Sequence, residues 1–424
     1  RARAIVRPAD TGEVSRTLAL CHEAGQPVVT HGGLTGLVGG ARTGPDDLVL
    51  SLERMNRLEP VDTANRTVTT QAGVPLQRIQ EAAEEAGLLF PLDLGARGSA
   101  TIGGNIATNA GGNSVIRYGM TREQVLGIEA VLADGTVISS LNHVIKNNTG
   151  YDLKQLFVGS EGTLGVVTRA VLRLRPLPRS RQTALVAVPD FDRLVAFLQA
   201  MDSALGGTLS AFEVMWNDFY RLIVGDGRKH GRPLDPDHAY YVLVESTGGD
   251  EAGDGQRFES ALHEALEQEM LADAVLAQSE QQRNDLWAIR DDVEGLVESL
   301  FPPLSFDISL NILNMEAYVD QVRARLSERW PQSRMVAFGH LGDGNIHLGI
   351  GVGSMAPEDV HAVEEIVYGS LGRGGVVSAE HGIGLEKREW LSCSRSPEEL
   401  ELMRTIKRAL DPKNILNPGK ILET

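Results

Sequence analysis

Two histidines, His340 and His347, stand where a pair of imidazoles could bind a metal ion. They bracket the run Leu341 to Ile346, which contains two glycines. Glycines allow a sharp reversal of the chain, so we expect the two imidazoles to lie close together at the ends of adjacent strands. This pattern alone does not exclude histidines that bind no metal, because two histidines in a turn are more often solvent-facing or hydrogen-bonded than metal-bound.

Arg290, within the run Leu286 to Arg290, is a candidate for binding a carboxylate. A guanidinium presents a planar fork that can bind a carboxylate through two hydrogen bonds, which lysine cannot do. The alternative is an exposed helix arginine paired with a neighbouring acid such as Glu294. The sequence alone does not favour either role for Arg290 over the other.

Three glycine-rich runs follow predicted strands or apolar segments in the first half of the chain. They are His31 to Gly40, Gly103 to Gly112 and Gly159 to Gly165. Glycines bring backbone N–H groups close to a phosphate, whereas any one such run could also be a mobile turn. Three of them favour a large phosphate-bearing cofactor. Neither a GxGxxG run nor a GxxxxGK[ST] run is present, which disfavours a Rossmann fingerprint and a P-loop.

The elements that must position these residues alternate between short strands and helices. We expect helices over 13–24 and 75–86 beside short strands in the first half, and an antiparallel sheet with helices on one face in the second. The run Arg175 to Arg179 breaks the first pattern. The predicted fold is α+β, with regions 1–178, 179–376 and 377–424, the last packing back on the first.

Composition limits the possible partners and compartments. The 424 residues carry 40 Lys and Arg against 57 Asp and Glu, a net charge of −17, so we expect no nucleic acid partner. No run reaches the roughly 18 apolar residues of a membrane span. The distant Cys21 and Cys393 form no CxxC pair, which fits a reducing cytoplasmic compartment. If a targeting segment precedes Arg1, the mitochondrial matrix is the alternative.

Several longer motifs, in order, carry a resemblance to a known family. The runs Phe90 to Gly98, Ile102 to Gly112, Arg117 to Gly119 and Asn148 to Gly165 resemble the FAD domain of the vanillyl-alcohol-oxidase superfamily. The runs Gly339 to His347 and Ser378 to Gly382 narrow the resemblance to the D-lactate and D-2-hydroxyglutarate dehydrogenase branch. Leu209 to Glu213 is closer to the hydroxyglutarate enzymes.

The resemblance implies an FAD domain of two small sheets in the first region. It places around the pyrophosphate, adenine and isoalloxazine of FAD the residues Gly32, Gly33, Thr35, Gly36, Pro91, Gly103, Gly104, Thr108, Asn109, Gly111, Glu161, Gly162, Val167 and, from the closing Asn-Pro turn, Asn417. We expect FAD to be held without a covalent bond. Because His31 stands where close relatives have Gln, a histidyl linkage stays open.

The resemblance also implies a metal and a catalytic set. It adds Glu380 to His340 and His347, and two nitrogens with one carboxylate suit a catalytic zinc, with manganese or iron as alternatives. His381 becomes the general base, because imidazole accepts a proton near neutral pH. Arg290 becomes the ligand of the substrate carboxylate. The expected reaction transfers the C2 hydride of a D-2-hydroxy acid to flavin N5 and leaves the 2-keto acid.

The substrate itself stays open at this point. This chain has Ser305 where hydroxyglutarate enzymes place a lysine, Glu294 for a small hydroxyl residue and Gly349 for an asparagine. A site unable to pair a distal carboxylate disfavours a five-carbon diacid. A D-2-hydroxyglutarate-like acid, D-lactate, D-malate and longer D-2-hydroxy acids all remain candidates.

The electron acceptor is inferred from what the resemblance implies. We expect an electron-transfer flavoprotein or a quinone as electron acceptor, and symmetry statistics favour a homodimer. The alternatives are an oxidase that uses oxygen directly, a non-catalytic flavin subunit of an electron-transfer complex, and a zinc hydrolase. The hydrolase would leave the glycine-rich runs unexplained.

Overall fold

The computed structural model describes residues 2–225 and 227–423, which fall into two compact units. Unit 1 combines the chain up to Gly112 with Tyr118–Leu177 and the segment from Glu380 onward. Unit 2 combines Asn113–Arg117 with Pro178–Ala379. Arg1 and Thr424, the outer bounds of the predicted regions 1–178 and 377–424, lie outside the described residues.

Unit 1 holds two small sheets, as the resemblance implies, and one two-stranded antiparallel pair, β5 with β9. One is parallel in the order β1-β3-β2, and the other is antiparallel in the order β4-β8-β6-β7. Its strands are β1 (Ala4–Val6), β2 (Val28–His31), β3 (Leu48–Ser51), β4 (Thr67–Gln71), β5 (Leu88–Leu89), β6 (Val125–Val131), β7 (Val137–Ser140), β8 (Val166–Arg173) and β9 (Arg175–Pro176). Its helices are α1 (Thr11–Ala24), α2 (Leu76–Glu85), α3 (Ile102–Thr108), α5 (Thr121–Gln124), α6 (Lys154–Phe157), η3 (Arg388–Cys393) and α14 (Pro397–Leu410), while α4 (Val115–Tyr118) contains the join between the units.

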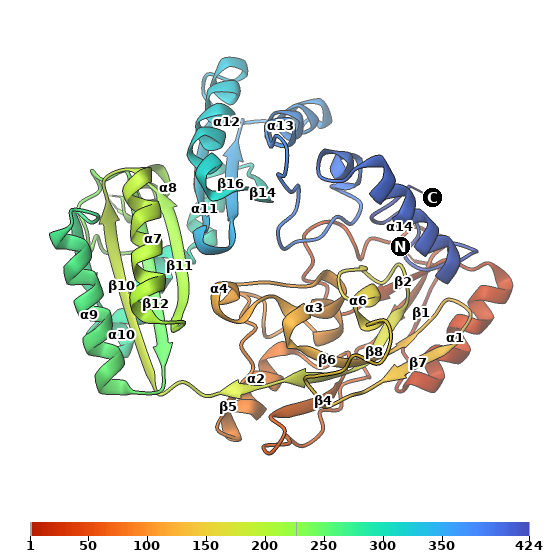
Figure 1. Cartoon of the computed structure of the whole chain (residues 1–424). Coiled ribbons are helices and arrows are strands. Elements are labelled where there is room, and N and C mark those ends of the chain that lie inside the picture. Colours follow the sequence, from red (N-terminus) through yellow and green to blue (C-terminus); the bar gives the residue numbers. More distant parts are fainter. Residues whose placement is uncertain (1, 226, 424) are drawn as a thin grey trace. The chain divides into compact units, whose positions relative to one another are not determined.

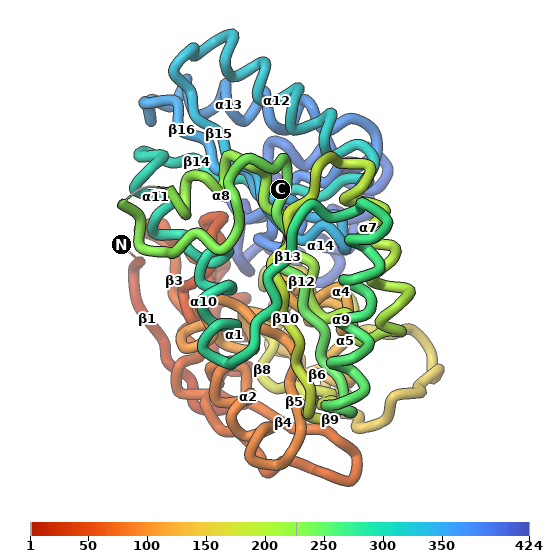
Figure 2. Tube along the Cα trace, turned by 90° about the vertical axis from the view of Figure 1, so that its left-hand side faces the viewer, coloured from red at the N-terminus to blue at the C-terminus, as the bar shows by residue number. Residues whose placement is uncertain are grey.

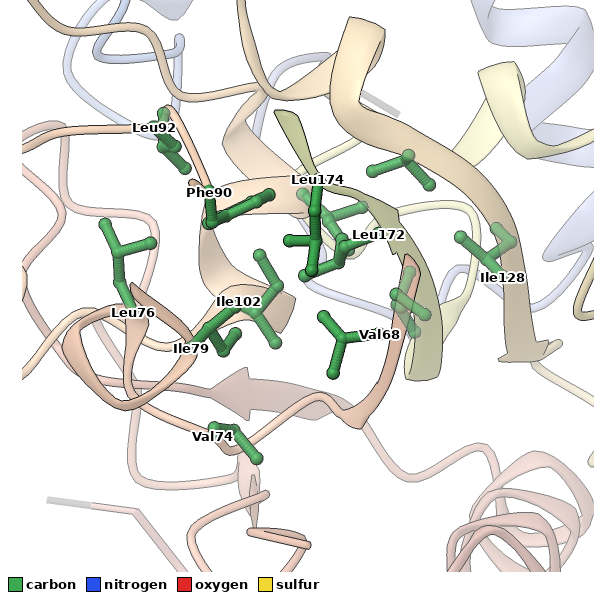
Figure 3. Close-up of a cluster of buried hydrophobic side chains, with 14 of the residues drawn as sticks. Val68, Val74, Leu76, Ile79, Phe90, Leu92, Ile102, Ile128, Leu172 and Leu174 are labelled. Carbon is green, nitrogen blue, oxygen red and sulfur yellow. The ribbon is translucent and has the colours of Figure 1, made fainter. Parts of the chain in front are cut away.

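Local signals set the ends of the helices in unit 1. The side chain of Asp10 accepts a hydrogen bond from the backbone of Glu13 and caps α1, which ends at Gly25 in the left-handed conformation. The amphipathic α2 turns Leu76 and Ile79 into a core that includes Phe90, Ile102 and Leu172, with the fully buried side chains meeting in Figure 3. The predicted helices over 13–24 and 75–86 are therefore confirmed.

The run Gly103 to Gly112, which the sequence analysis treats as a phosphate-binding run or a mobile turn, is helical in its first half. Residues Ile102–Thr108 form α3, which ends at Asn109 in the left-handed conformation. The glycines serve close packing instead of flexibility, because a Cβ at Gly103 would lie 2.7 Å from the Cβ of Ala72. A pattern of small residues does not distinguish a tightly packed helix from a turn.

Unit 2 is built on one antiparallel sheet in the order β13-β10-β12-β11-β15-β16-β14. Its strands are β10 (Ser180–Val188), β11 (Leu209–Trp216), β12 (Tyr240–Gly248), β13 (Asp273–Leu276), β14 (Leu304–Ser309), β15 (Arg334–His340) and β16 (Asn345–Gly351). Its helices are α7 (Phe191–Leu205), α8 (Asn217–Val224), α9 (Glu251–Glu267), α10 (Glu280–Arg290), α11 (Val293–Leu300), η1 (Ile312–Asn314), α12 (Met315–Arg329), η2 (Leu341–Asp343) and α13 (Pro357–Gly369).

Helices cover both faces of this sheet, where the sequence predicted one. Helix α7 lies in front of β10, β12 and β11 in Figure 1, with the rings of Phe197 and Phe212 5.5 Å apart. Helices α8 and α10 pack on the other face, where Phe219 and Ile289 join Met215 in one apolar cluster, and Figure 2 has α10 and α9 on opposite sides of these strands. Strands β11 and β12 are accordingly buried along their whole length. A strand that is apolar along its whole length has no polar and apolar alternation, so its sequence does not show whether one or both faces of the sheet are covered.

The C-terminal segment belongs to unit 1, as predicted. Leu416 forms a parallel bridge with Val28 beside the first sheet, and Ile415 lies in the same apolar cluster as Val28. Helix α14 starts with a capping box between Ser396 and Glu399. No helix in the described part of the chain is long and apolar enough to cross a membrane.

Candidate active site

Four ionisable side chains lie on one face of the unit 2 sheet because of its register. Glu213 in β11 pairs with His340 in β15, and Phe338, two residues before His340, pairs with His347 in β16. Asp307 in β14 pairs with His347 from the other side. Directly paired residues and residues two apart along a strand point to the same face. The reversal over η2 therefore brings the two predicted histidines together, with their ring centroids 5.3 Å apart.

Glu213 joins a histidine and an arginine in a buried network. Its Oε1 lies 2.6 Å from Nδ1 of His340, and its Oε2 accepts a hydrogen bond of 2.8 Å from Nε of Arg290. All three side chains are buried. Burial by itself raises the pKa of Glu213, but its interactions with His340 and Arg290 outweigh that effect and hold the pKa below its usual value.

His347 also has a carboxylate at its Nδ1. Oδ1 of Asp307 lies 3.8 Å from that nitrogen, and Asp307 is itself held by Nδ2 of Asn345 at 2.8 Å and by the hydroxyl of Ser378 at 3.4 Å. A carboxylate hydrogen-bonded to Nδ1, as in His340, favours the tautomer whose Nε2 carries the lone pair, which is the arrangement of metal-binding histidines in proteins, whereas 3.8 Å at His347 is longer than a hydrogen bond. The donor set of unit 2 thus fits a divalent metal bound by Nε2 of His340 and one ring nitrogen of His347.

Helix α10 places Arg290 over this face of the sheet. Ser279 caps the helix by accepting a hydrogen bond from Gln282, and Arg290 is its last residue. One turn earlier, Nε1 of Trp287 donates to Oε2 of Glu245 in β12 at 3.0 Å. Two glutamates on neighbouring strands therefore anchor the same helix, which makes the position of the Arg290 guanidinium rigid.

The predicted cofactor residues are in unit 1, where the first glycine-rich run follows β2. A Cβ at Gly33 would lie 2.0 Å from the carbonyl oxygen of Ser99, and one at Gly32 would lie 2.6 Å from Oγ1 of Thr101. Only glycine permits the chain to pass this close. Leu34 is held at a φ of 58°, and the rest of the run up to Leu37 is exposed.

Buried polar atoms beside this run fit a ligand rich in hydrogen-bonding groups. Oγ1 of Thr30, Oγ1 of Thr101 and Oδ1 of Asn105 are buried without a hydrogen-bond partner within residues 2–225 and 227–423. Such groups normally find partners in a folded protein. The hydroxyls and phosphates of FAD would supply them, so the residues present fit the cofactor.

Asn417 connects the end of the chain to two of the glycine-rich runs. Its Oδ1 accepts a hydrogen bond of 3.1 Å from the backbone of Thr30, and its Nδ2 donates to the carbonyl of Glu161 at 2.5 Å. A Cβ at Gly162 would lie 2.9 Å from that Nδ2. Lys407 of α14 supports the same region, because its buried Nζ donates to the carbonyl of Thr163 at 2.9 Å.

Glu161 holds the segment that carries His381. Its buried carboxylate accepts hydrogen bonds from the backbones of Ile383 at 2.7 Å and Gly384 at 2.9 Å. Burial raises the pKa of Glu161, an effect that these two bonds only partly oppose. The neighbouring Glu380 accepts a 2.6 Å bond from the backbone of Gly112 through its Oε1. The predicted base and third metal ligand therefore lie on a loop pinned from both sides within unit 1.

Other predicted cofactor residues have structural contacts of their own. The amide of Asn109 binds the 120–122 segment through a 2.9 Å bond from the backbone of Arg122. Val167 belongs to the same buried apolar cluster as Ile102 and Leu172. His31 makes a 2.9 Å contact from Nε2 to the carbonyl of Ala41, and burial lowers its pKa. The remaining predicted residues in unit 1 are Thr35 and Gly36 after β2, Pro91 after β5, Gly104 and Thr108 in α3, and Gly111 after it.

Sequence reasoning gave no role to Glu213, Asp307 and Lys407. The available signal was a charge inside an apolar strand, as in Leu209–Trp216, because a buried charge is tolerated only with a partner. For Lys407 the signal was Asp411 four residues later in a helix.

Comparison with known proteins agrees with this geometry. Residues 2–140 match the family described as FAD binding domain, and residues 177–421 match the family of FAD linked oxidases, C-terminal domain. A D-2-hydroxyglutarate dehydrogenase of Xanthomonas citri pv. viticola is 41% identical over 99% of this chain and 89% of its own length. The mitochondrial D-2-hydroxyglutarate dehydrogenase of Bos taurus is 40% identical over 100% and 77%.

A more distant relative and a solved structure complete the comparison. A putative mitochondrial D-lactate dehydrogenase of Schizosaccharomyces pombe is 38% identical over 98% of this chain and 81% of its own. The structure of an alkyldihydroxyacetonephosphate synthase superposes with a TM-score of 0.74 at 18% identity, over 98% of this chain and 76% of that one, which is a likeness of fold. The chain therefore belongs to the FAD-linked oxidase family, in the branch of the D-2-hydroxyglutarate and D-lactate dehydrogenases.

Proposed function

We propose that the protein oxidises a D-2-hydroxy acid to the 2-keto acid with FAD and a divalent metal. The observation that carries the proposal is the buried network in which Glu213 binds both Arg290 and His340. It puts a carboxylate-binding guanidinium next to an imidazole whose tautomer suits a metal, which is the pair of groups that a 2-hydroxy acid needs.

In this proposal His340, His347 and Glu380 bind the metal, with zinc first and manganese or iron as alternatives. Bound FAD supplies the two-electron acceptor, and the metal supplies a Lewis acid that acidifies the substrate hydroxyl. The residues predicted for FAD are those of unit 1, with the unpartnered oxygens of Thr30 and Thr101 as support. Noncovalent binding agrees with His31, whose Nε2 already contacts the carbonyl of Ala41.

Arg290 binds and orients the substrate carboxylate, and His381 accepts the hydroxyl proton. The proton goes to the imidazole while the C2 hydrogen leaves with its electron pair, so the C2–O bond becomes a carbonyl. Support for His381 is its place on the loop that Glu161 pins through Ile383 and Gly384. A pinned loop keeps the base in one position through the reaction.

The substrate proposed is a D-2-hydroxy acid such as D-2-hydroxyglutarate, D-lactate or D-malate. Gly349 argues for the smaller or less charged members of this class. A Cβ there would lie 2.9 Å from Leu300 and 3.2 Å from Val336, so this part of the face is apolar. A distal carboxylate beside it would be poorly compensated.

The test is an anaerobic visible spectrum of the metal-replete protein before and after addition of each D-acid, with the L-acids as controls. Flavin bands that bleach with one D-acid only would establish cofactor, reaction and substrate. A His381→Ala variant should keep the flavin spectrum and bleach at least about 100-fold more slowly. A protein that shows no flavin bands after incubation with FAD contradicts the proposal.

The acceptor and assembly are proposed from the same family. An electron-transfer flavoprotein or a quinone would reoxidise the flavin, and peroxide formed rapidly in air would indicate an oxidase instead. We propose a homodimer in the cytoplasm or in the mitochondrial matrix; the bovine relative is named as mitochondrial.

A further inference from the structure

Glu213 is the only charged residue in the strand Leu209–Trp216, and its exposed fraction is 1%. A carboxylate at such a position costs several kcal/mol unless hydrogen bonds and opposite charges compensate it. A purely structural strand would carry an apolar residue here, as Ala211 and Met215, which share its face of the sheet, do. The two partners of Glu213 therefore indicate what the residue is for.

Each oxygen of Glu213 serves a different partner. Oε1 faces Nδ1 of His340 at 2.6 Å, and an ionised carboxylate can only accept, so Nδ1 carries the proton and Nε2 presents its lone pair. Oε2 binds Nε of Arg290 at 2.8 Å, which fixes the rotation of the guanidinium. One carboxylate thus sets the tautomer of a proposed metal ligand and the orientation of the proposed substrate clamp.

The same contacts bring two positive centres together. Nη2 of Arg290 lies 3.5 Å from Nε2 of His340, the atom proposed to bind a divalent cation. In a buried site the repulsion between a guanidinium and a dication is weakly screened. Two carboxylates compensate that guanidinium: the buried Glu213 at 2.8 Å and the more exposed Asp291 at 3.3 Å. Glu213 is the one that also bonds His340.

We propose that Glu213 is a positioning residue that lets the metal and the substrate carboxylate bind side by side. It holds the Nε2 atom of His340 and the guanidinium of Arg290 at a fixed separation and neutralises the guanidinium. The inference rests on the metal site of the proposed function. Neither the metal nor the substrate touches Glu213 itself.

The first experiment measures metal affinity without turnover. Metal-free, FAD-loaded protein is titrated with Zn²⁺ or Mn²⁺ in competition with a chromogenic chelator. Glu213→Gln keeps the shape and removes the charge, and it should raise the metal Kd about 10- to 100-fold, as loss of a carboxylate behind a ligating histidine does.

Glu245→Gln is the matched control. Glu245 is a buried carboxylate on the neighbouring strand β12 and anchors the same helix through Trp287, with Thr183 donating to it at 2.8 Å. It contacts neither His340 nor Arg290 through any bond found among the described residues. Its replacement should change the metal Kd by less than about twofold, because a site without a shared partner is energetically independent.

A second experiment tests whether Glu213 acts through its negative charge on the Arg290 guanidinium or only through its packing. Arg290→Met, with Glu213 intact, should bind the metal at least as tightly as the unmodified protein. The double variant Glu213→Gln with Arg290→Met should recover part of the affinity lost in Glu213→Gln, because it also removes a guanidinium that has lost one of its two carboxylate partners while Asp291 remains. A merely structural Glu213 would give a double variant as weak as, or weaker than, Glu213→Gln.

The outcomes distinguish this inference from the proposed function. If the unmodified protein takes up no metal, the proposed metal site is wrong. If it binds metal and Glu213→Gln binds it with the same Kd, or if the double variant recovers nothing, only the role of Glu213 is wrong.

Discussion

The candidate binding sites of the two units are built from different groups: backbone in unit 1 and charged side chains in unit 2. In unit 1 the glycine-rich runs shape the site by the absence of side chains, and the buried oxygens of Thr30 and Thr101 have no partner within the described residues. In unit 2 charged side chains shape the site, and both oxygens of Glu213 are already bonded. A backbone cradle suits a large cofactor that brings its own polar groups, while a preorganised charge cluster suits a small anion and a cation.

This difference predicts which changes each unit tolerates. Unit 1 should fail when an atom is added at a close approach, or when the few side chains that support the runs are removed. Unit 2 should keep its fold and lose binding when the geometry of a charge changes. The following variants test that contrast.

The largest expected effect is the loss of stability when Lys407, the buried cation that supports unit 1, is replaced. Its Nζ bonds Asp411, the carbonyl of Leu416 and the carbonyl of Thr163. Lys407→Met leaves the buried Asp411 carboxylate without its cation and with only backbone hydrogen bonds from Ile415 and Leu416, so we expect the free energy of unfolding to fall by about 3 to 5 kcal/mol and FAD to be lost. Urea unfolding followed by flavin absorbance measures both.

Lys413→Met is the control for Lys407. Within residues 2–225 and 227–423, Lys413 bonds only the carbonyl of His22, in an exposed contact. It should change the unfolding free energy by less than about 0.5 kcal/mol. Equal losses in the two variants would mean that α14 does not support the glycine-rich run at Thr163.

The next effect compares two glycines three residues apart. Gly33→Ala places a Cβ 2.0 Å from the Ser99 carbonyl, which should cost about 3 kcal/mol and weaken FAD binding, because backbone cannot move aside cheaply. At Gly36 nothing lies within 4 Å of the new Cβ, so Gly36→Ala should leave stability nearly unchanged. Thermal unfolding with and without added FAD separates the two, and similar melting curves would contradict the close approach.

A smaller effect is expected for Arg290→Lys in unit 2. Lysine keeps the charge and loses the planar fork, so kcat/KM should fall about 30-fold, equivalent to about 2 kcal/mol, with little change in unfolding. Arg283→Lys on the same helix, where Arg283 pairs with the exposed Glu280, is the control and should be neutral. Unchanged kcat/KM in Arg290→Lys would exclude a bidentate clamp.

The smallest effect is a pH dependence from Glu161. Because burial raises its pKa above the usual 4.5, its contribution to stability is full below that value and is lost as the pH rises through the higher folded pKa. Glu161→Gln should flatten the stability curve over that rise. Glu386→Gln, at an exposed pair with Arg42, should not, and parallel curves for all three proteins would contradict a shifted Glu161.

Much of the local structure followed from sequence because its causes are local. The Asp10 cap and Gly25 end of α1, and the glycines between His340 and His347, act within a few residues. The helix at Ile102–Thr108 was missed because its small residues pack against Ala72, which no local pattern reveals. The motifs of the FAD-linked oxidases named the histidines and Arg290 but not what holds them.

The sequence by itself determined the element order, the glycine-rich runs and the family. Only the tertiary structure decided that Glu213 bonds Arg290, 77 residues away, and His340, 127 residues away, and that Lys407 reaches Thr163 across 244 residues. Such pairings depend on strand register and on which face of the sheet a helix covers. Strand register and the covered face are determined by burial of the apolar core as a whole. A shift of one residue would turn Glu213 to the opposite face, away from both partners.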